Sequence, residues 1–373
     1  MTADLDVRAM RRALALAKRG WGRVAPNPMV GAVVVRDGAV VGEGYHDEWG
    51  GAHAEVMALK AAGSKARGAT LYVSLEPCHH QGKTGPCSQE IKRAGIARVV
   101  CAASEVNPEA AGGVEWLVGQ GVEVRRGVCE SEAEDLNAIH FHTFRHQRPF
   151  LALKYALTLD AKLSEAPGRS SRVTGAEAVR EAHRLRAGHD VVMVGIGTAR
   201  VDDPQLTVRE WSAPRRAPVR AVLDSGLSLS PESRLARSAR DVPVWVFGAP
   251  DASPERAARL EASGVNVIAV ERYADRPGLD LGMVLASLWE RNIRSVLCEG
   301  GGSLGSAWLA SGYVDRLYAF VAPRVFGDPG VAAFQGERRQ AAAEWRLVER
   351  QEFGSDTLLV LDPAAAAGAD EDV

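Results

Sequence analysis

The sequence contains no run of eighteen apolar residues, which is roughly the length that a transmembrane helix requires. Residues 1–20 carry too many charged side chains for a secretory signal. A large excess of positive charge is also missing, because 45 lysines and arginines stand against 47 acidic residues. The net charge therefore gives no reason to expect a nucleic acid or a membrane as a partner. These absences predict a cytoplasmic protein. Any site for a polyanion would depend on a few nearby residues rather than on the net charge of the chain.

Cysteine is scarce, with five residues in a chain of 373. An odd number of cysteines without a secretory signal argues against a disulfide framework and favours free thiols or metal ligands. The chain is longer than one hydrophobic core usually serves, so we expect two domains. Apolar residues make up 46% and charged residues 25%, which is typical of a globular protein with a large core.

Helical and strand patterns alternate along the first 146 residues. A helix is expected over residues 4–20, with Gly20 as its stop. Two apolar runs on either side of the Asp37-Gly38 pair predict a β-hairpin over residues 31–45. Such alternation predicts βαβ units with a mostly parallel sheet. The further expected helices are 53–63, 87–95 and 112–121, and the further strands are 69–75, 97–103 and 122–127.

A polar segment, residues 130–149, lacks strand character and ends the first series. We therefore place a first domain at residues 1–146 and a second at residues 147–363. The second series is again of the α/β kind. Its expected strands are 150–156, 190–196, 219–224, 242–248, 265–270, 294–300, 316–323 and 356–362, and its helices are 176–188, 254–264, 282–292 and 303–312. The acidic, alanine-rich residues 364–373 predict a disordered tail.

A candidate metal site consists of His53, Cys78 and Cys87. One imidazole and two thiolates supply three zinc ligands and leave a fourth position open, as in catalytic zinc sites. Glu55 lies two residues after His53 and would not share its helix face, so it could face a metal-bound water instead. H-x-E followed by P-C-x-x-C is the signature of zinc nucleobase deaminases. Eight residues separate the two cysteines here, however, so a structural zinc site remains an alternative.

The long interval between the cysteines has a composition of its own, HHQGKTGP. Its two glycines allow close approach of the backbone to a ligand, Lys83 supplies a positive charge and Thr84 a hydroxyl donor. These features favour contact with a phosphate. Two alternatives are a plain solvated loop and a loop in which His79 or His80 serves as a metal ligand.

Two glycine-rich turns stand out in the second domain. Gly195, Gly197 and Thr198 follow an apolar strand, where amides and a hydroxyl could approach a cofactor. The acidic pair at 202–203 before a proline could equally be only a turn. Residues 299–305 lie between a strand and a helix, a place that favours a phosphate. The arrangement is not the standard dinucleotide fingerprint, so a plain tight turn is the alternative.

Several of these motifs resemble those of a known family. APNPMVGAVVV, GEGYHDEWGGAHAEVMAL and EPCHHQGKTGPC resemble the deaminase half of the bifunctional deaminase/reductase family of riboflavin biosynthesis. FLALKYALTLDAK, VGIGTARVDDPQLTVR, LDSGL, CEGGGSLGSAWL and VDRLYAFVAPRVFG resemble its reductase half. The resemblance implies an N-terminal cytidine-deaminase-like α/β/α domain of three layers and a C-terminal dihydrofolate-reductase-like α/β domain.

The resemblance also implies two reactions. The first is the hydrolytic deamination of a diaminopyrimidinone that carries a phosphoribosylamino group, with one Zn²⁺ in the deaminase domain. The second is the reduction of the ribosyl group to ribityl phosphate, with NADPH as hydride donor. We expect a small phosphorylated pyrimidine as substrate, no nucleic-acid or membrane partner, and a homo-oligomer.

The resemblance implies residues of three kinds: those for zinc binding and catalysis, those for substrate binding and those for NADPH binding. His53, Cys78 and Cys87 would bind zinc, Glu55 would carry protons, and Lys154 would act as an acid or electrostatic aid near the sugar carbonyl. The positions implied in substrate binding are Asn27, His46, His80, Lys83, Ser170, Leu206, Arg209 and Glu299. The positions implied in NADPH binding are Ala156, Arg172, Thr198, Asp202, Ser225, Gly301, Gly302, Ser303, Leu304 and Gly305.

Three places depart from the family pattern. An acidic-Pro-Asn-Pro turn is replaced by Glu105-Val106-Asn107-Pro108, which leaves the roles of Glu105 and Asn107 open. ALTLDAK stands where the family has GASLDGR, and Arg172 stands where it has a tryptophan. Arg172 could meet a cofactor phosphate.

Two other classes of protein are compatible with parts of this pattern. A nucleic-acid or nucleoside base deaminase with an accessory domain would need a basic, aromatic-bearing surface around its pocket, which the balanced charge and the wide cysteine spacing disfavour. A zinc-stabilised binding protein without catalysis would keep the metal ligands but would not oxidise NADPH.

Overall fold

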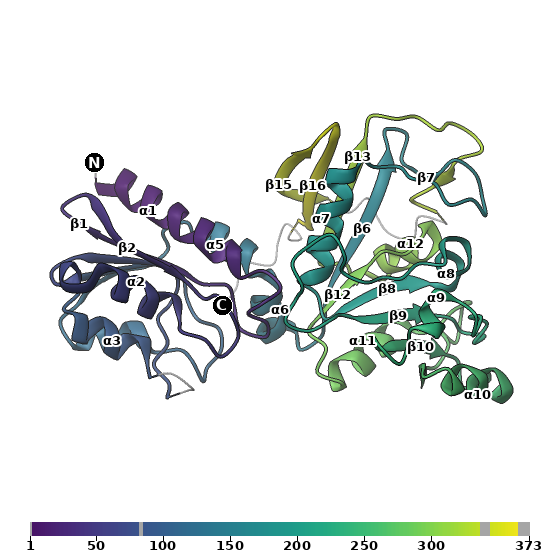
Figure 1. Cartoon of the computed structure of the whole chain (residues 1–373), viewed down its shortest axis with the longest axis horizontal. Coiled ribbons are helices and arrows are strands. Elements are labelled where there is room, and N and C mark those ends of the chain that lie inside the picture. The colour runs from purple at the N-terminus through teal and green to yellow at the C-terminus, as the bar shows by residue number, and fades with distance from the viewer. Residues whose placement is uncertain (1, 82–84, 336–343, 365–373) are drawn as a thin grey trace. The chain divides into compact units, whose positions relative to one another are not determined.

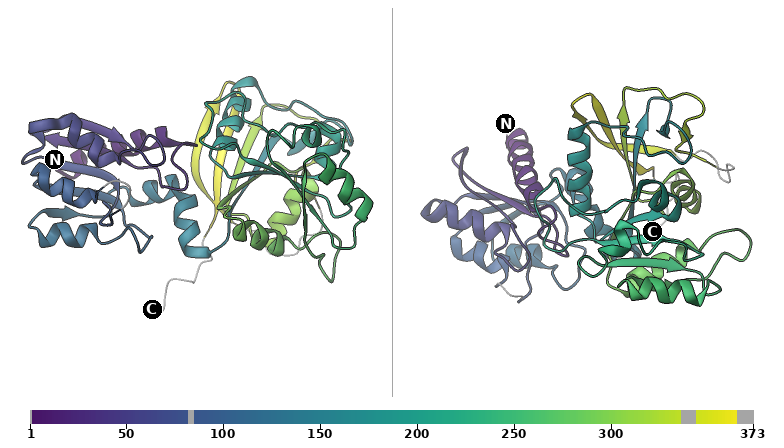
Figure 2. Two further views of the ribbon diagram at one scale, coloured as in Figure 1. Left: turned by 60° about the horizontal axis from the view of Figure 1, so that its bottom comes forward. Right: turned by 45° about the vertical axis from the view of Figure 1, so that its right-hand side comes forward.

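The computed structural model describes residues 2–81, 85–335 and 344–364. The chain divides into two compact units, Met1–His146 and Gln147–Val373, and each is described by itself (Figure 1, Figure 2). Most of the predicted tail, from residue 365 onward, lies outside the described residues. Within the described part of the chain, no helix has both the length and the apolar character that a membrane crossing demands.

The first unit is built on a five-stranded sheet with the order β2-β1-β3-β4-β5. β1 is antiparallel to both of its neighbours, whereas β3, β4 and β5 are parallel. The predicted hairpin is confirmed, and both of its turn residues, Asp37 and Gly38, have the positive φ that a tight two-residue turn requires. The strands are β1 (Gly31–Arg36), β2 (Ala39–Tyr45), β3 (Thr70–Leu75), β4 (Arg98–Ala103) and β5 (Glu123–Arg125).

Helices cover both faces of this sheet, which makes three layers. Successive residues of β1 alternate between the two sides, so Val33 packs with Met10 of α1 whereas Val34 packs with Ala58 of α2. The α1 side also holds α5 and α6, and the α2 side also holds α3 and α4. The helices are α1 (Thr2–Ala17), α2 (Ala54–Ala62), α3 (Cys87–Ala94), α4 (Gly113–Gly119), α5 (Glu130–Leu136) and α6 (Ala138–His146).

Glycines on the strands let the helices approach closely. A Cβ at Gly44 of β2 would lie 2.5 Å from the carbonyl oxygen of Ala54, in the first turn of α2. A Cβ at Gly42 would lie 2.3 Å from the carbonyl oxygen of Ala58, one turn later. No side chain fits there without a shift, so these glycines fix how closely the start of α2 lies on the sheet.

A buried carboxylate ties α1 to the sheet. Asp6 is only 1% exposed, and it accepts hydrogen bonds from Tyr72 (2.7 Å), from Arg98 (2.9 and 3.0 Å) and from Arg125 (2.8 Å). The hydrogen bonds from Arg98 lead the effects that lower the pKa of Asp6, against the opposing effect of burial. The three donors come from β3, β4 and β5, so one ionised side chain joins α1 to three strands.

The second unit is built on a nine-stranded sheet with the order β11-β10-β9-β8-β12-β6-β13-β16-β15. The strands from β11 to β13 are parallel, and β16 and β15 add an antiparallel edge (Figure 1). Apart from the short pair β7 (Lys162–Ser164) and β14 (Val331–Ala332), the strands are β6 (Phe150–Thr158), β8 (Val191–Gly195), β9 (Val219–Leu223), β10 (Val244–Gly248), β11 (Asn266–Ala269), β12 (Ser295–Cys298), β13 (Arg316–Ala322), β15 (Trp345–Phe353) and β16 (Asp356–Pro363).

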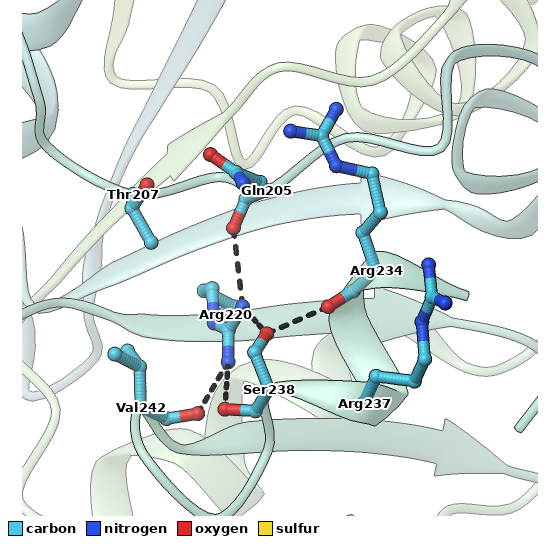
Figure 3. Close-up of a pocket in the computed structure, with 7 residues that line it drawn as sticks. All are labelled: Gln205, Thr207, Arg220, Arg234, Arg237, Ser238 and Val242. Atoms are coloured by element: carbon cyan, nitrogen blue, oxygen red, sulfur yellow. Dashed lines mark hydrogen bonds between the residues drawn. The ribbon is translucent and has the colours of Figure 1, made fainter. Parts of the chain in front are cut away.

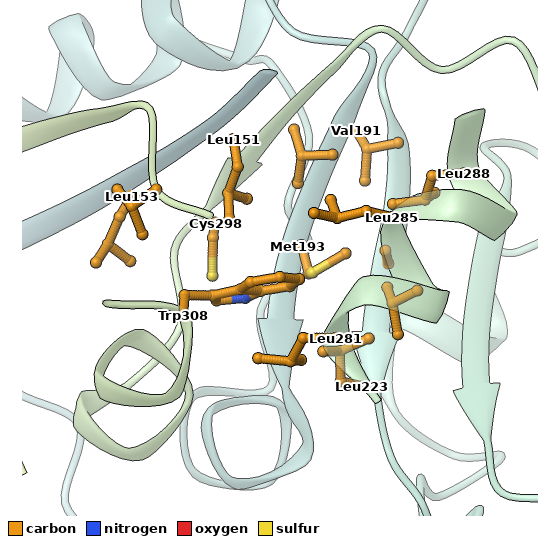
Figure 4. Close-up of a cluster of buried hydrophobic side chains, with 14 of the residues drawn as sticks. Leu151, Leu153, Val191, Met193, Leu223, Leu281, Leu285, Leu288, Cys298 and Trp308 are labelled. Carbon is orange, nitrogen blue, oxygen red and sulfur yellow. The ribbon is translucent and has the colours of Figure 1, made fainter. Parts of the chain in front are cut away.

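Two hydrophobic clusters cover the two faces of the larger sheet. The indole of Trp308 on α12 is fully buried beside Met193 of β8 and Cys298 of β12, with Leu281 and Leu285 of α11 in the same cluster (Figure 4). The other cluster holds side chains of α8, α9 and α10. The helices are α7 (Ala176–Ala187), α8 (Ile196–Asp202), α9 (Arg234–Arg237), α10 (Pro254–Ala262), α11 (Leu281–Glu290) and α12 (Gly302–Ser311).

Asp6→Asn should destabilise the first unit by roughly 2 kcal/mol or more, because it leaves two guanidinium groups beside an amide. The folded pKa of Asp6 is lowered, so its contribution is complete above the unfolded pKa of about 3.9 and is lost as the pH falls through the folded value. Hydrogen exchange of the α1 amides at neutral pH should be faster in this variant. Asp4→Asn, which removes only an exposed pair with Arg8, is the control. Equal exchange in both variants would contradict the assignment.

Candidate active sites

Three elements of the first unit bring the predicted metal ligands together. His53 immediately precedes α2, Cys87 is the first residue of α3, and Cys78 lies in the loop after β3. The imidazole Nδ1 lies 3.2 Å from Sγ of Cys87 and 3.5 Å from Sγ of Cys78. All three ligand atoms lie within 4.8 Å of one another, and in the described part of the chain no other group of three such residues converges in this way.

This geometry fits a zinc ion. Two ligands of one zinc are separated by at most about 4.6 Å, twice a Zn–S bond of about 2.3 Å, and both Nδ1–Sγ distances are shorter than this. Hydrogen bonding from Cys87 and then from His53 lowers the pKa of Cys78, which favours the thiolate that a metal requires. The backbone amide of Cys87 also donates to Sγ of Cys78 over 3.5 Å. A soft ligand set of two sulfurs and one imidazole is typical of zinc.

Glu55 lies beside this cluster without joining it. Its side chain is in the first turn of α2 and the residue is 3% exposed. Burial, followed by the negative charge of Cys78, raises the pKa of Glu55 to about 7. A carboxyl group with such a pKa can both take up and release a proton at neutral pH, although a bound cation would lower the value. The position therefore suits a proton carrier.

Two of the predicted substrate residues, Asn27 and His46, lie next to the cluster. The ring centroid of His46 is 5.5 Å from that of His53. Nδ1 of His46 lies 3.1 Å from the carbonyl oxygen of Ala52, and Nε2 lies 3.2 Å from Nδ2 of Asn27. Burial lowers the pKa of His46 and favours the neutral ring, so Nδ1 donates to the carbonyl and Nε2 accepts from the amide. These bonds fix both side chains beside the metal site.

The loop between the cysteines is described only in part. Lys83 and Thr84 fall within residues 82–84, outside the described residues, and the predicted phosphate contact of Lys83 stays a prediction. His80 is exposed at the edge of this gap. His79 points elsewhere, since Nδ1 lies 2.8 Å from Oγ of Ser88 and the ring stacks on Trp116. His79 is therefore engaged with helices α3 and α4.

Sequence reasoning missed two residues that organise the neighbouring turn, Glu76 and His140. The carboxylate of Glu76 accepts from the amides of Gly112 and Val114 (3.2 Å each) and of Glu105 (3.3 Å). Oε1 of Glu105 lies 2.8 Å from Nε2 of His140 on α6 and accepts from the amide of Asn107. The position of Glu76 directly before the Pro77-Cys78 motif is the only feature of the sequence that could have pointed to it. In this structure Glu105 is paired within the protein.

In the second unit, many predicted residues gather at the carboxyl ends of parallel strands. Ala156 lies near the end of β6, Gly195 ends β8, Ser225 follows β9 and Glu299 follows β12. β6, β12, β8 and β9 are neighbours in the sheet. This edge is where open α/β sheets bind their ligands.

A charged group of three side chains, Glu299, Lys154 and Arg186, lies at this edge. Oε2 of Glu299 lies 3.9 Å from Nζ of Lys154, and its carboxylate accepts two hydrogen bonds from Arg186 on α7 (2.5 and 2.9 Å). Burial would raise the pKa of Glu299, but Arg186 and then Lys154 outweigh it and hold the pKa at about 2. Burial lowers the pKa of Lys154, which makes its ammonium a better proton donor.

Arg186, near the end of α7, was not among the predicted site residues. In the structure it also donates to the carbonyl of Thr207 (3.1 Å), and Arg209 donates to the hydroxyl of the same threonine (2.8 Å). The amide of Arg209 donates to His183 (3.2 Å). The side chain of Leu206 is buried in the core, so only its backbone could contact a substrate.

The predicted NADPH residues include a tightly packed strand-to-helix turn. Oγ1 of Thr198 accepts from the amide of Gly301, which precedes α12 (3.0 Å). A Cβ at Gly305 would lie 1.8 Å from the hydroxyl of Tyr155, and one at Gly302 would lie 2.4 Å from the carbonyl of Ala332. These two glycines therefore have a packing role besides any contact with a cofactor.

The remaining predicted positions make fewer contacts or are exposed. Ser303 donates to the side chain of Gln335, and the carbonyl of Ser225 accepts from Ala249. Leu304 packs against the main cluster. Three predicted residues, Ser170, Arg172 and Asp202, are exposed.

Two family models match the chain. One is the cytidine and deoxycytidylate deaminase zinc-binding region, over residues 3–103, and the other is the RibD C-terminal domain, over residues 149–359. The riboflavin biosynthesis protein RibD of Aquifex aeolicus is 43% identical over 329 residues, which cover 88% of this chain and 90% of that protein. The Escherichia coli protein of the same name is 36% identical, with 94% and 98% covered.

Solved structures agree over nearly the whole chain. A diaminohydroxyphosphoribosylaminopyrimidine deaminase/5-amino-6-(5-phosphoribosylamino)uracil reductase from Thermotoga maritima is 35% identical with a TM-score of 0.80, and 98% of this chain and 100% of that chain are covered. A RibD from Acinetobacter baumannii is 34% identical with the same TM-score, with 97% and 100% covered. Fold and site thus define a zinc-dependent deaminase of the cytidine deaminase type, joined to a reductase.

The chain belongs to the RibD family of riboflavin biosynthesis proteins. The predicted fold class, a cytidine-deaminase-like domain followed by a dihydrofolate-reductase-like domain, is confirmed. The protein is a deaminase that uses Zn²⁺ and a reductase of the NADPH-dependent kind. Neither the nucleic-acid deaminase nor the non-catalytic binding protein gains support from these relatives.

Cys87→Ser should remove most of the bound zinc and with it the release of ammonia, because one of three protein ligands is lost. Metal content can be measured by mass spectrometry of the purified chain, alongside both activities. NADPH oxidation should persist when the deaminated intermediate is supplied as substrate, since the zinc ligands lie in the first unit. Cys129→Ser, a cysteine outside the cluster, is the matched control. Full zinc content in Cys87→Ser would refute the ligand assignment.

Proposed function

We propose that this chain deaminates a diaminopyrimidinone bearing a phosphoribosylamino group and then reduces the ribosyl group of the product to ribityl phosphate. The proposal rests chiefly on the convergence of His53, Cys78 and Cys87 beside the buried Glu55. The two activities for which the Thermotoga maritima relative is named support it. The charged group around Glu299 supplies a second site suited to a sugar carbonyl and a phosphate.

In the deaminase site, His53 and the two cysteines would hold zinc, which when bound lowers the pKa of a coordinated water towards 7. Glu55 would take the two protons of the attacking water and give one to the neighbouring ring nitrogen and one to the departing amine. The C–N bond then breaks, ammonia leaves, and the water oxygen becomes the carbonyl oxygen. Asn27 and His46, already joined by a hydrogen bond, orient the pyrimidine ring beside it. His80 and Lys83 bind the phosphoribosyl arm.

In the reductase site, NADPH when bound supplies a hydride to C1′ of the ribosyl group. Lys154 donates the proton that the ribose ring oxygen needs when its bond to C1′ breaks. Glu299 holds Lys154 and Arg186 in place through its two carboxylate oxygens. Arg186 and Arg209, which share Thr207 as a hydrogen-bond partner, bind the substrate phosphate. Ser170 and the backbone of Leu206 complete this side.

The cofactor would lie along the carboxyl edge of the sheet. Its phosphates would meet the turn 301–305, the N-terminus of α12 and the hydroxyl of Thr198. Ala156, Ser225, Asp202 and Arg172 would complete this site. We assign the deaminase to residues 1–146 and the reductase to residues 147–363, because each set of site residues lies within one of these ranges.

We further propose that the protein is a cytoplasmic homo-oligomer. The balanced charge and the lack of a long apolar helix among the described residues support a cytoplasmic place. Exposed apolar side chains of the second unit, Leu159, Val325, Phe334 and Leu347, could be covered by a second copy. Light scattering of the purified chain would give the number of copies.

Glu55→Gln should keep its zinc but release ammonia about 10² to 10⁴ times more slowly, because an amide cannot carry the proton. Ammonia release and metal content are measured on the same sample. Glu115→Gln, an exposed residue of the same unit, should behave as the unmodified protein. Unimpaired ammonia release in Glu55→Gln would rule out the assigned role.

Lys154→Met should slow NADPH oxidation by about 10² or more, since the proton donor at the sugar is lost. The affinity for NADPH, measured by fluorescence quenching, should change little, and ammonia release by the same variant should be normal. A large loss of NADPH affinity with a normal maximal rate would show that Lys154 binds cofactor instead.

A further inference from the structure

A pocket of about 430 Å³ in the second unit has a strongly basic lining (Figure 3). Three arginines contribute, Arg220 from β9 and Arg234 and Arg237 from α9. The other lining residues are neutral, and none of the seven is acidic. They are Gln205, Thr207, Ser238 and Val242.

Arg220 supplies a buried positive charge. It is 1% exposed, and its guanidinium donates to the carbonyls of Gln205 (3.2 Å), Ser238 (3.0 Å) and Val242 and to the hydroxyl of Ser238 (2.8 Å). All of these acceptors are neutral. Burial lowers the pKa of Arg220 to about 10, so the guanidinium is still charged at neutral pH. Asp241 acts on it only through longer-range attraction. Within the described residues, its Nε has no hydrogen-bond partner.

The two arginines of α9 add charge that their own contacts do not neutralise. They are exposed and stand three residues apart, so they lie on one face of the helical turn. Arg234 donates to the carbonyl of Asp203 over 3.4 Å, while the carboxylate of Asp203 accepts from the backbone amide of Arg234. The side chain of Arg237 makes no hydrogen bond or ion pair within residues 2–81, 85–335 and 344–364.

This pocket differs from the charged group at the reductase site. There, the carboxylate of Glu299 pairs with both Arg186 and Lys154. Here, none of the three guanidinium groups donates to a carboxylate within the described residues. The side chains of Arg234 and Arg237 are exposed and can turn toward an anion in the pocket, which the buried charge of Arg220 would also attract. Guanidinium groups match the oxygens of a phosphate in pairs.

We propose that the pocket lined by Arg220, Arg234 and Arg237 is a binding site for a phosphate dianion. Arg234 and Arg237 donate to its oxygens, and Arg220 supplies a fixed positive charge behind them. The anion is either free phosphate or the phosphoryl group of a sugar phosphate. None of the pocket's lining residues is assigned to substrate or NADPH. Thr207 of the lining is the hydrogen-bond partner of Arg186 and Arg209, so the pocket adjoins the proposed substrate site. The proposal does not rest on the proposed function.

Calorimetric titration of the full chain with inorganic phosphate, and separately with ribose 5-phosphate, tests the proposal. Arg234→Ala/Arg237→Ala removes two exposed side chains and should leave the fold intact. It should bind one phosphate fewer per chain, or bind at that site at least about tenfold more weakly. The difference between the unmodified protein and the double variant isolates this site from the proposed substrate site at Arg186 and Arg209. At the isolated site, stronger binding of ribose 5-phosphate than of phosphate would identify a sugar phosphate as the ligand, and the reverse would identify the free anion.

Arg240→Ala, an exposed arginine next to α9 that does not line the pocket, is the control and should bind as the unmodified protein does. Crystals of the full chain soaked in tungstate, a heavy analogue of phosphate, should show an anomalous peak between the three arginines. The absence of that peak, or an unchanged number of bound phosphates in the double variant, would overturn the proposal.

Discussion

The close packing of α2 on β2 is the constraint on which the deaminase site depends. Gly42 and Gly44 leave no room for a side chain, so the helix lies against the strand and its start is fixed. That start carries His53 and Glu55, and α3 starts at Cys87, so backbone packing sets the 3.2 Å contact between imidazole and thiol. The metal ligands are therefore held by helix ends and the sheet, and only Cys78 depends on a loop.

In the second unit, ion pairs rather than close backbone packing hold the site residues in position. Glu299 accepts from Arg186 and lies near Lys154, so one carboxylate orients two cations at the carboxyl edge of the sheet. Because its pKa is held at about 2, Glu299 stays ionised and keeps both partners in place across the physiological pH range. The same edge presents the amides that precede α12, which favours a phosphorylated cofactor beside the sugar.

Local patterns in the sequence predicted most of the fold but less of the two sites. Strands with apolar runs and helices with clear stops were found, whereas β15 was missed because this edge strand alternates little between buried and exposed residues. Segment 130–149 lacks strand character, as predicted, and forms the helices α5 and α6, for which its polar composition gives no clear periodicity. The metal ligands could be predicted because their motifs are specific. Arg186, His140 and Glu76 could not, since their partners are distant in sequence and only the folded chain brings them together.

A coupled assay with the diaminopyrimidinone substrate tests the central claim most directly, with ammonia release and NADPH oxidation recorded separately on the zinc-loaded chain. The account predicts that ammonia appears first and that NADPH oxidation follows in equal amount. Removal of zinc with a chelator should abolish both signals, and addition of the deaminated intermediate should restore NADPH oxidation alone. NADPH oxidation that proceeds on the diamino substrate without ammonia release would contradict the account.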